Sequence, residues 1–174
     1  MLAAPTLSKP KPDYYIFGDG ASSQKQDIGA WCALIIRVSD MQTKVLTGTE
    51  FPTTISRMEL MPMISSLRWL LRNWHKGPKL PNVTIYSDSE YTIKTINGVL
   101  PANKNTELWV ALNHLKEKIN GDFIWQERNT MPQTVFVDAV CTTLRRVNKR
   151  ALNDMFNDYK DPEKSIGKFK LPED

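Results

Sequence analysis

Four acidic residues have a spacing that suits metal-dependent chemistry. They are Asp19, Glu59, Asp88 and Asp138. The first and third follow short apolar runs, the second lies near the start of a helical pattern, and the fourth interrupts an apolar helical stretch. Four carboxylates at one point would repel one another unless cations neutralised them. Oxygen ligands suit Mg²⁺ or Mn²⁺, and two such ions about 3.5 to 4 Å apart promote in-line displacement at phosphorus.

Each of the four residues also has a purely structural interpretation. Asp19 precedes a glycine and could belong to a turn. Glu59 has the spacing of a capping box with Ser56. Asp88 could cap the helix that follows it, and Asp138 could lie on an exposed helical face. Composition and spacing alone leave both interpretations open.

The hydrophobic pattern predicts the elements that must position these residues. Short apolar or alternating runs predict strands at 14–17, 29–38, 43–51, 83–88 and 123–126. Helical spacing predicts helices from 56 to just before 77, at 89–97, through 108–119 and at 135–152 or beyond. Pro62 lies inside the first of these helices, where its missing N–H predicts a bend. The order predicts an α/β fold with three antiparallel strands first and parallel crossovers after them.

The length of 174 residues suits a single domain, and 41% hydrophobic residues supply its core. We expect a disordered segment at 1–13, one folded domain at 14–152 and a polar extension at 153–174. Cys32 and Cys141 lie in apolar segments, which predicts buried, reduced thiols. The chain shows no signal peptide and no run of about 18 to 20 apolar residues. We therefore expect a cytoplasmic protein without a membrane partner.

The charge of the chain suits an anionic partner without requiring one. Lysine and arginine total 23 against 19 acidic residues, which gives a net charge of +4 and a pI near 9.0. If the four carboxylates form one site, 15 acidic residues lie elsewhere and the remainder carries +8. Such a distribution predicts an acidic pocket for cations within a basic surround.

Four segments resemble the motifs of type 1 ribonuclease H and occur in that family's order. They are Phe17–Ser22, Ser56–Met61, Thr84–Tyr91 and Asn105–Trp109. The resemblance covers about residues 14–146. It implies the family's fold, a ribonuclease H-like five-stranded mixed sheet flanked by helices. That fold agrees with the element order derived from the hydrophobic pattern.

The resemblance implies an endonuclease that hydrolyses the RNA strand of RNA–DNA hybrids with two Mg²⁺ ions, for which Mn²⁺ would substitute. By motif, Asp19 would bridge both ions. Glu59 and Asp88 would hold one ion, and Asp138 would hold the other. We expect a monomer without a small-molecule cofactor. Two alternatives stay open: a catalytically silent module that binds hybrids or duplexes, and a recombination-type nuclease that cuts DNA.

The same motifs imply contacts with the nucleic acid. Thr54 matches a position that binds a phosphate of the DNA strand. Ser89 and Glu90 match positions that contact 2′-hydroxyl groups in the minor groove. Arg145 and Arg146 in the last predicted helix could contact phosphate, although a solvated helical face is the alternative.

The chain departs from the family's pattern where a histidine usually stands. Arg128 occupies that position, ten residues before Asp138. An arginine does not accept a proton near neutral pH, so a general-base role is lost. We expect Arg128 to contact the scissile phosphate or the leaving group, with an ordinary surface arginine as the alternative. A basic insertion found in many members is reduced to residues 99–104.

Overall fold

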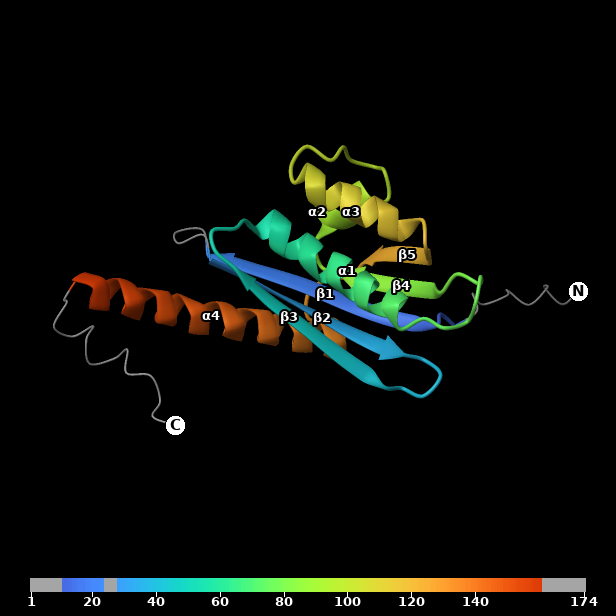
Figure 1. The fold of residues 1–174 in the computed structure, drawn as a ribbon, viewed down its shortest axis with the longest axis horizontal. Helices are drawn as coiled ribbons and strands as arrows, with labels where there is room; N and C mark the ends of the chain where they lie inside the picture. Colours follow the sequence, from blue (N-terminus) through green and yellow to red (C-terminus); the bar gives the residue numbers. More distant parts are fainter. Residues whose placement is uncertain (1–10, 24–27, 161–174) are drawn as a thin grey trace, which may run out of the picture.

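The computed structural model describes residues 11–23 and 28–160, and for 152–160 it describes the backbone alone (Figure 1). Within these ranges the chain forms five strands and four helices. The strands are β1 (Tyr14–Ser23), β2 (Ile28–Arg37), β3 (Thr43–Glu50), β4 (Asn82–Ser87) and β5 (Asn120–Trp125). The helices are α1 (Ile55–Arg72), α2 (Glu90–Ile96), α3 (Thr106–Lys116) and α4 (Pro132–Lys160).

The strands form one mixed sheet in the spatial order β3-β2-β1-β4-β5. The pairs β1–β2 and β2–β3 are antiparallel, whereas β1–β4 and β4–β5 are parallel. The predicted fold class is therefore confirmed. The helices between the parallel strands make the crossovers that such pairing needs.

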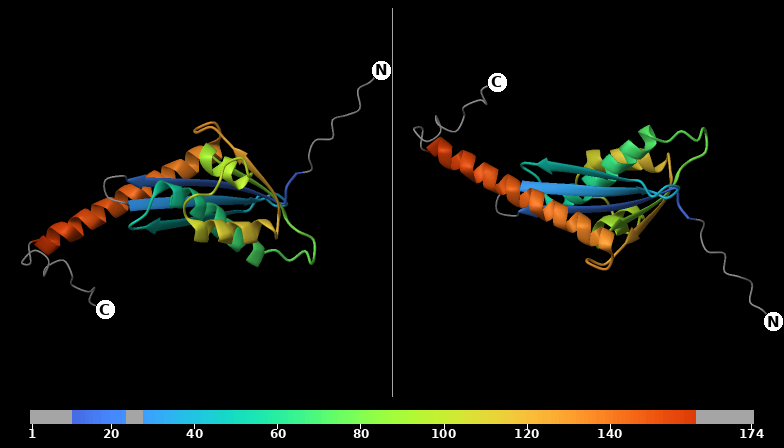
Figure 2. Two further views of the ribbon diagram at one scale, coloured as in Figure 1. Left: turned by 90° about the horizontal axis from the view of Figure 1, so that it is seen from above. Right: turned by 90° about the horizontal axis from the view of Figure 1, so that it is seen from below.

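Helices cover both faces of the sheet (Figures 1 and 2). One core joins α1, α2 and α3 to residues of β1, β2 and β4, including Ile16, Ile35 and Ile85. A second core joins α4 to the opposite face of β1 and β2. Because side chains alternate along a strand, even-numbered β1 positions such as Ile16 face α1 and odd-numbered positions face α4.

Strand β1 is longer than the sequence predicts. Our expectation that the strand ends near Asp19 is wrong, because Asp19 pairs with Cys32 inside the β1–β2 ladder. The parallel pairing with β4 stops earlier, at Gly18 opposite Ser87. The edge of β1 from Asp19 onward is thus not covered by β4. Both helix α1 and helix α4 can approach this open edge.

The two glycines beside Asp19 serve close packing and not a turn. A Cβ at Gly20 would lie 2.4 Å from the backbone carbonyl of Met58, and one at Gly18 would lie 3.2 Å from the Cβ of Pro62. Helix α1 therefore rests directly on the backbone of β1. Pro62 lies inside this helix, which continues through it to Arg72.

The ends of several elements also differ from the prediction. Thr54 caps α1, and its hydroxyl accepts the backbone N–H of Arg57 at 3.4 Å, so the alternative interpretation of Ser56 and Glu59 as a capping box is excluded. Asp13, expected in the disordered segment, exchanges backbone and side-chain hydrogen bonds with residue 82 and belongs to the fold. Residues 1–10 lie outside the described part.

Helix α4 continues to Lys160, past the expected boundary at 152, and residues 161–174 of the expected extension lie outside the described part. Cys32 and Cys141 are buried and free, as predicted. Burial raises the pKa of Cys32 to about 12, so both the position and the ionisation of this thiol suit a core residue. Within the described ranges, no helix combines the length and apolar character that crossing a membrane requires.

Candidate active site

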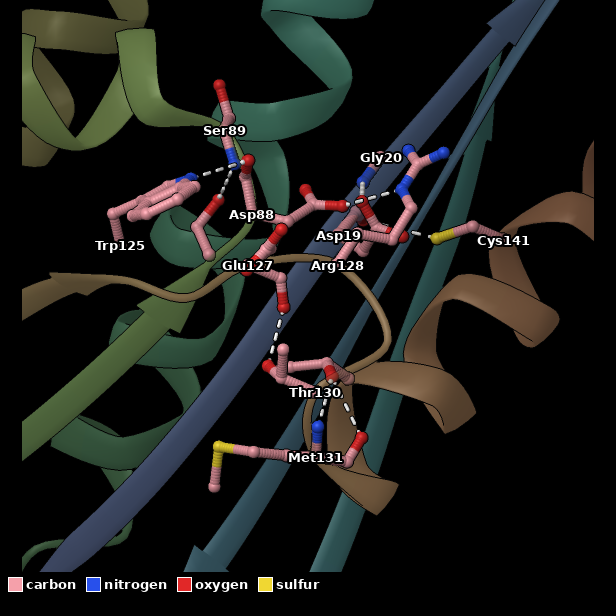
Figure 3. Close-up of polar contacts among 12 residues, drawn as sticks. Asp19, Gly20, Asp88, Ser89, Trp125, Glu127, Arg128, Thr130, Met131 and Cys141 are labelled. Atoms are coloured by element: carbon pink, nitrogen blue, oxygen red, sulfur yellow. Dashed lines mark hydrogen bonds and ion pairs between the residues drawn. The ribbon is translucent and has the colours of Figure 1, made fainter.

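Asp19 stands at the centre of the site on the open edge of β1 (Figure 3). Its side chain is 2% exposed, and the backbone N–H of Gly20 donates to Oδ1 at 2.9 Å. The Cys141 thiol of α4 donates to its backbone oxygen at 3.1 Å. Oδ2 is buried and has no hydrogen-bond partner among the described residues. Burial first, and then the negative charge of Asp88, raises the pKa of Asp19 to about 8.

Glu59 reaches Asp19 from α1. It lies one residue after Met58, where Gly20 lets the helix approach the strand, and it is buried. Its Oε2 lacks a hydrogen-bond partner within the described part of the chain. Burial raises the pKa of Glu59 well above its ordinary value, and the charges of Asp19 and Asp88 add to the increase.

Asp88 follows the last residue of β4 and completes the group. Its backbone oxygen accepts the indole N–H of Trp125 at 3.1 Å, which ties the end of β4 to the end of β5 (Figure 3). Its carboxylate accepts a hydrogen bond from the Arg128 guanidinium at 3.1 Å. The Asp88 side chain is 12% exposed. Sequence reasoning missed Trp125, because no local pattern indicates a contact across 37 residues.

The three carboxylates form a site that fits a hard cation. Asp19, Glu59 and Asp88 each offer an oxygen, and these atoms lie within 4.8 Å of one another. Two buried oxygens without partners and two raised pKa values mean that the group is strained without a neutralising cation. All the ligand atoms are carboxylate oxygens, which suits Mg²⁺ or Mn²⁺.

Asp138 lies next to this group and not within it. It belongs to the second turn of α4 and is half-buried, on the face of the sheet that Asp19 also faces. Its negative charge is one of the causes that raise the pKa of Asp19. The structure thus places the fourth predicted ligand close enough to act on Asp19, on the side opposite to Glu59.

Arg128 is held beside the carboxylates by a structured loop between β5 and α4. In this loop the Thr130 hydroxyl donates to the Glu127 backbone oxygen at 2.6 Å, and Asn129 adopts a left-handed conformation with φ of 61°. The Arg128 side chain is 62% exposed, and it forms an ion pair with Asp88. That hydrogen bond raises the pKa of Arg128, which stays charged.

Comparison with known proteins then decides the family. The model of the ribonuclease H family matches residues 11–148 of this chain. This chain belongs to the ribonuclease H family. A ribonuclease H of Caldicellulosiruptor saccharolyticus is 36% identical over 112 residues, which cover 64% of this chain and 70% of that protein. A ribonuclease H of Cupriavidus metallidurans is 36% identical over 115 residues, 59% and 73% of the respective chains.

Solved structures show the ribonuclease H fold at lower identity. The N-terminal RNase H domain of a Mycobacterium tuberculosis protein has a TM-score of 0.69 at 13% identity, over 82% of this chain and 99% of that one. LC11-RNase H1, solved in complex with an RNA/DNA hybrid, has a TM-score of 0.61 at 18% identity, over 71% and 92%. These structures confirm the predicted ribonuclease H-like fold, and the family model confirms the predicted ribonuclease H.

In this ribonuclease H, a groove leads away from the carboxylates along α1 and α2. A cavity of about 470 Å³ is lined by residues of the site and by Ile55, Ser56, Ser89, Tyr91, Thr92 and Arg128. A second cavity of about 280 Å³ shares three of these residues and extends to the start of α3 at Asn105. Tyr91 is 46% exposed between the two cavities. The motif Thr84–Tyr91 indicates no role for Tyr91 of its own, although an exposed aromatic residue beside a polar cluster is itself a signal of binding.

The predicted nucleic-acid contacts lie on different parts of the ribonuclease H surface. Thr54 is exposed at the start of α1. The Ser89 hydroxyl accepts the backbone N–H of Thr92 at 3.3 Å and so caps α2. Glu90 is exposed and pairs with Lys94 at 2.8 Å. Ser89 therefore combines a structural role with a place in the lining of the groove, whereas Glu90 lies outside that lining.

The two predicted arginines of α4 differ from each other. Arg145 is half-buried, and its Nη1 donates to the backbone oxygen of Ser22 at 3.3 Å. Its Nε is buried without a hydrogen-bond partner in the described residues. Arg146 is exposed. Arg145 thus joins α4 to β1, whereas Arg146 is free to meet a ligand in solution.

Proposed function

We propose that this ribonuclease H hydrolyses the RNA strand of RNA–DNA hybrids by a two-metal-ion mechanism. The observation that carries the proposal is the convergence of Asp19, Glu59 and Asp88, with buried oxygens that lack partners among the described residues, in a chain of this family. A buried acidic group of this kind is costly for a folded protein unless it binds cations. Cations in turn explain why a nuclease keeps negative charge where the phosphate must bind.

The residues divide between two positions for Mg²⁺, with Mn²⁺ as a substitute. Glu59 and Asp88 would hold one ion, Asp138 would hold the other, and Asp19 between them would contact both. When bound, such ions activate water and stabilise the negative charge that develops on the phosphate and on the leaving 3′ oxygen. The protein's own contribution is to hold the four carboxylates in fixed positions before the substrate arrives.

Arg128 supplies a positive charge at the edge of the site. Its guanidinium stays protonated and donates to Asp88, so it does not take a proton from water. Its exposed position, on a loop between the metal site and solvent, lets the guanidinium reach a phosphate oxygen or the leaving group. We assign it this electrostatic role.

The groove along α1 and α2 supports the preference for a hybrid. Glu59, Ser89 and Glu90 lie where oxygen acceptors and a hydroxyl can contact 2′-hydroxyl groups of the RNA strand. The exposed Thr54 hydroxyl at the start of α1 would bind a phosphate of the DNA strand. LC11-RNase H1, a protein of the same fold, is known in complex with an RNA/DNA hybrid.

A substrate panel tests this function. Purified protein is incubated in Mg²⁺, Mn²⁺ or EDTA with end-labelled RNA–DNA hybrid, RNA duplex and DNA duplex of one sequence. We expect internal cuts in the RNA strand of the hybrid, only in the presence of metal. Binding to the hybrid without cleavage in either metal would identify a silent binding module, and cleavage of the DNA duplex would identify a recombination-type nuclease.

We further propose that the protein acts as a monomer without a small-molecule cofactor. The cytoplasm, where buried free thiols such as Cys32 and Cys141 remain reduced, is the proposed compartment. Light scattering across the concentrations used in the cleavage assay tests the monomer, and a mass that rises with concentration contradicts it.

A further inference from the structure

Beyond the candidate metal site, helix α4 continues with a stretch in which every charged side chain is basic. The stretch 139–151 contains no acidic residue and four cations, which are Arg145, Arg146, Lys149 and Arg150. No described side chain forms an ion pair with any of them. In the views of Figures 1 and 2, α4 runs along the sheet and projects past its end.

Of the basic residues, Arg145 and Lys149 follow the same side of α4 as Asp138, whereas Arg146 and Arg150 are turned about 80° and 120° away from it. Residues 138, 145 and 149 share one helical face, since their spacing of seven and eleven residues returns to nearly the same direction. With a rise of 1.5 Å per residue, Arg145 lies about 10 Å and Arg150 about 18 Å from Asp138 along the helix axis. Arg146 and Arg150 are exposed beside this face. The positive charges thus begin where the acidic site ends.

Two contacts fix α4 to β1 and so fix this surface relative to the metal site. The Cys141 thiol donates to the Asp19 backbone oxygen, and Arg145 Nη1 donates to the Ser22 backbone oxygen. Both acceptors belong to β1, three residues apart. These contacts therefore fix the basic segment of α4 relative to β1, the strand that carries Asp19.

We propose that Arg146, Lys149 and Arg150 form a second binding surface of this protein, which holds backbone phosphates of the hybrid to one side of the cut. The inference rests on the proposed function and extends it. A duplex carries one negative charge per about 1.7 Å of its axis, and the distance of about 6 Å between Arg146 and Arg150 along the helix axis spans roughly two base pairs at 3.4 Å each. The three cations can therefore meet the phosphates of neighbouring nucleotides, and they read no base sequence. Arg145 serves as the anchor of the surface.

Salt-dependent binding tests the surface directly. The triple variant Arg146→Gln/Lys149→Gln/Arg150→Gln is compared with Arg68→Gln/Arg72→Gln/Lys79→Gln, which removes the same charge from exposed residues near the other end of α1. Both sets are made in an Asp88→Asn background to prevent cleavage. Fluorescence anisotropy with a hybrid of about 20 base pairs then gives Kd at four or more salt concentrations, and circular dichroism confirms that each variant is folded.

The α4 set should weaken binding at least 10-fold at 0.1 M salt and reduce the slope of log affinity against log salt by about 2 to 3, since each phosphate contact contributes about 0.9. The α1 set should change Kd less than 2-fold and leave the slope unaltered. Equal slopes for the two sets would overturn the inference. In an otherwise wild-type chain, the α4 set should also raise KM for hybrid cleavage.

Failure of this inference is distinguishable from failure of the proposed function. If the wild-type protein cleaves the hybrid and the α4 set binds with an unchanged slope, the second surface is refuted and the nuclease stands. If the wild-type protein cleaves no hybrid in either metal and the slope still changes, α4 binds nucleic acid and the nuclease assignment is refuted.

Discussion

An acidic region and a basic region adjoin at α4, and different interactions stabilise each of them. The acidic region around Asp19 is buried and depends on the packing of β1, β4 and α1. The basic region at 145–150 is exposed at Arg146 and Arg150 and half-buried at Arg145 and Lys149, and it depends on the helix and its contacts with β1. Charges interact more strongly in a buried site than in water, so the loss of one carboxylate should change the acidic region greatly. Charges in the exposed region are screened by salt, so the loss of one cation there should have a smaller effect. Mutations should therefore have large effects on chemistry at the first region and graded effects on binding at the second.

Removing a central carboxylate should produce the largest effect. Asp19→Asn should lower the rate of hybrid cleavage by at least about 10³-fold, since loss of several kcal/mol of charge stabilisation costs tenfold per 1.36 kcal/mol. The same variant should stabilise the metal-free protein by about 1 to 3 kcal/mol at pH 8, because it removes the burial of a negative charge and the repulsion by Asp88, which together raise the pKa of Asp19. Single-turnover kinetics and urea unfolding in EDTA measure the two quantities. A variant that loses activity and stability together would show that Asp19 is a structural residue.

Disturbing the packing beneath the site should have the next largest effect. Gly20→Ala places a Cβ 2.4 Å from the Met58 carbonyl and should push α1, with Glu59, away from Asp19. A displacement of about 1 Å can cost about 10²-fold in rate, and overpacking costs about 1 to 3 kcal/mol. Gly18→Ala, with a milder contact of 3.2 Å to the Pro62 side chain, is the matched control. Equal effects of the two substitutions contradict the close approach of α1 as the cause.

Removing the positive charge beside the carboxylates should change two properties in opposite directions. Arg128→Ala should lower kcat about 10-fold, the value of one charge-assisted hydrogen bond. It should also tighten Mn²⁺ binding several-fold, because the guanidinium that donates to Asp88 no longer competes for that carboxylate. Isothermal titration calorimetry with Mn²⁺ measures the affinity without substrate. Weaker Mn²⁺ binding, or an unchanged kcat, assigns Arg128 to the ordinary protein surface.

A last effect, on stability and not on rate, is a pH dependence in the absence of metal. The raised pKa values of Asp19 and Glu59 mean that the folded state binds more protons than the unfolded chain between about pH 5 and 8. The free energy of unfolding should therefore fall as the pH rises through this range in EDTA. Urea unfolding at pH 5, 6.5 and 8 measures it, and the slope should be flatter in Asp19→Asn. A free energy that rises with pH contradicts the raised pKa values.

The hydrophobic pattern predicts most of the fold, because the change from alternating to helical period along the chain is local. It does not place Asp19 correctly. A Gly-Asp-Gly sequence suits a turn and a strand packed closely by a helix equally well, and only the position of Met58 distinguishes them. Thr54 and Ser56 are both competent caps, and tertiary packing selects Thr54.

The sequence predicts which residues form the candidate site, but it does not predict the contacts that they make. The resemblance to the family identifies the carboxylates by order and spacing along the chain. The ion pair of Arg128 with Asp88 and the hydrogen bond from Trp125 join segments 37 to 40 residues apart. No sequence period encodes such contacts, because they depend on where β4 and β5 end in the sheet.

The most direct test of the account is single-turnover cleavage of an RNA–DNA hybrid by the wild-type protein and by Asp88→Asn in Mg²⁺. This substitution keeps the size of the side chain, and circular dichroism with thermal unfolding verifies the fold. We expect internal cleavage of the RNA strand by the wild type and a rate at least about 10³-fold lower in the variant, since a ligand carboxylate supplies several kcal/mol of transition-state stabilisation. Comparable cleavage by both proteins would contradict this expectation.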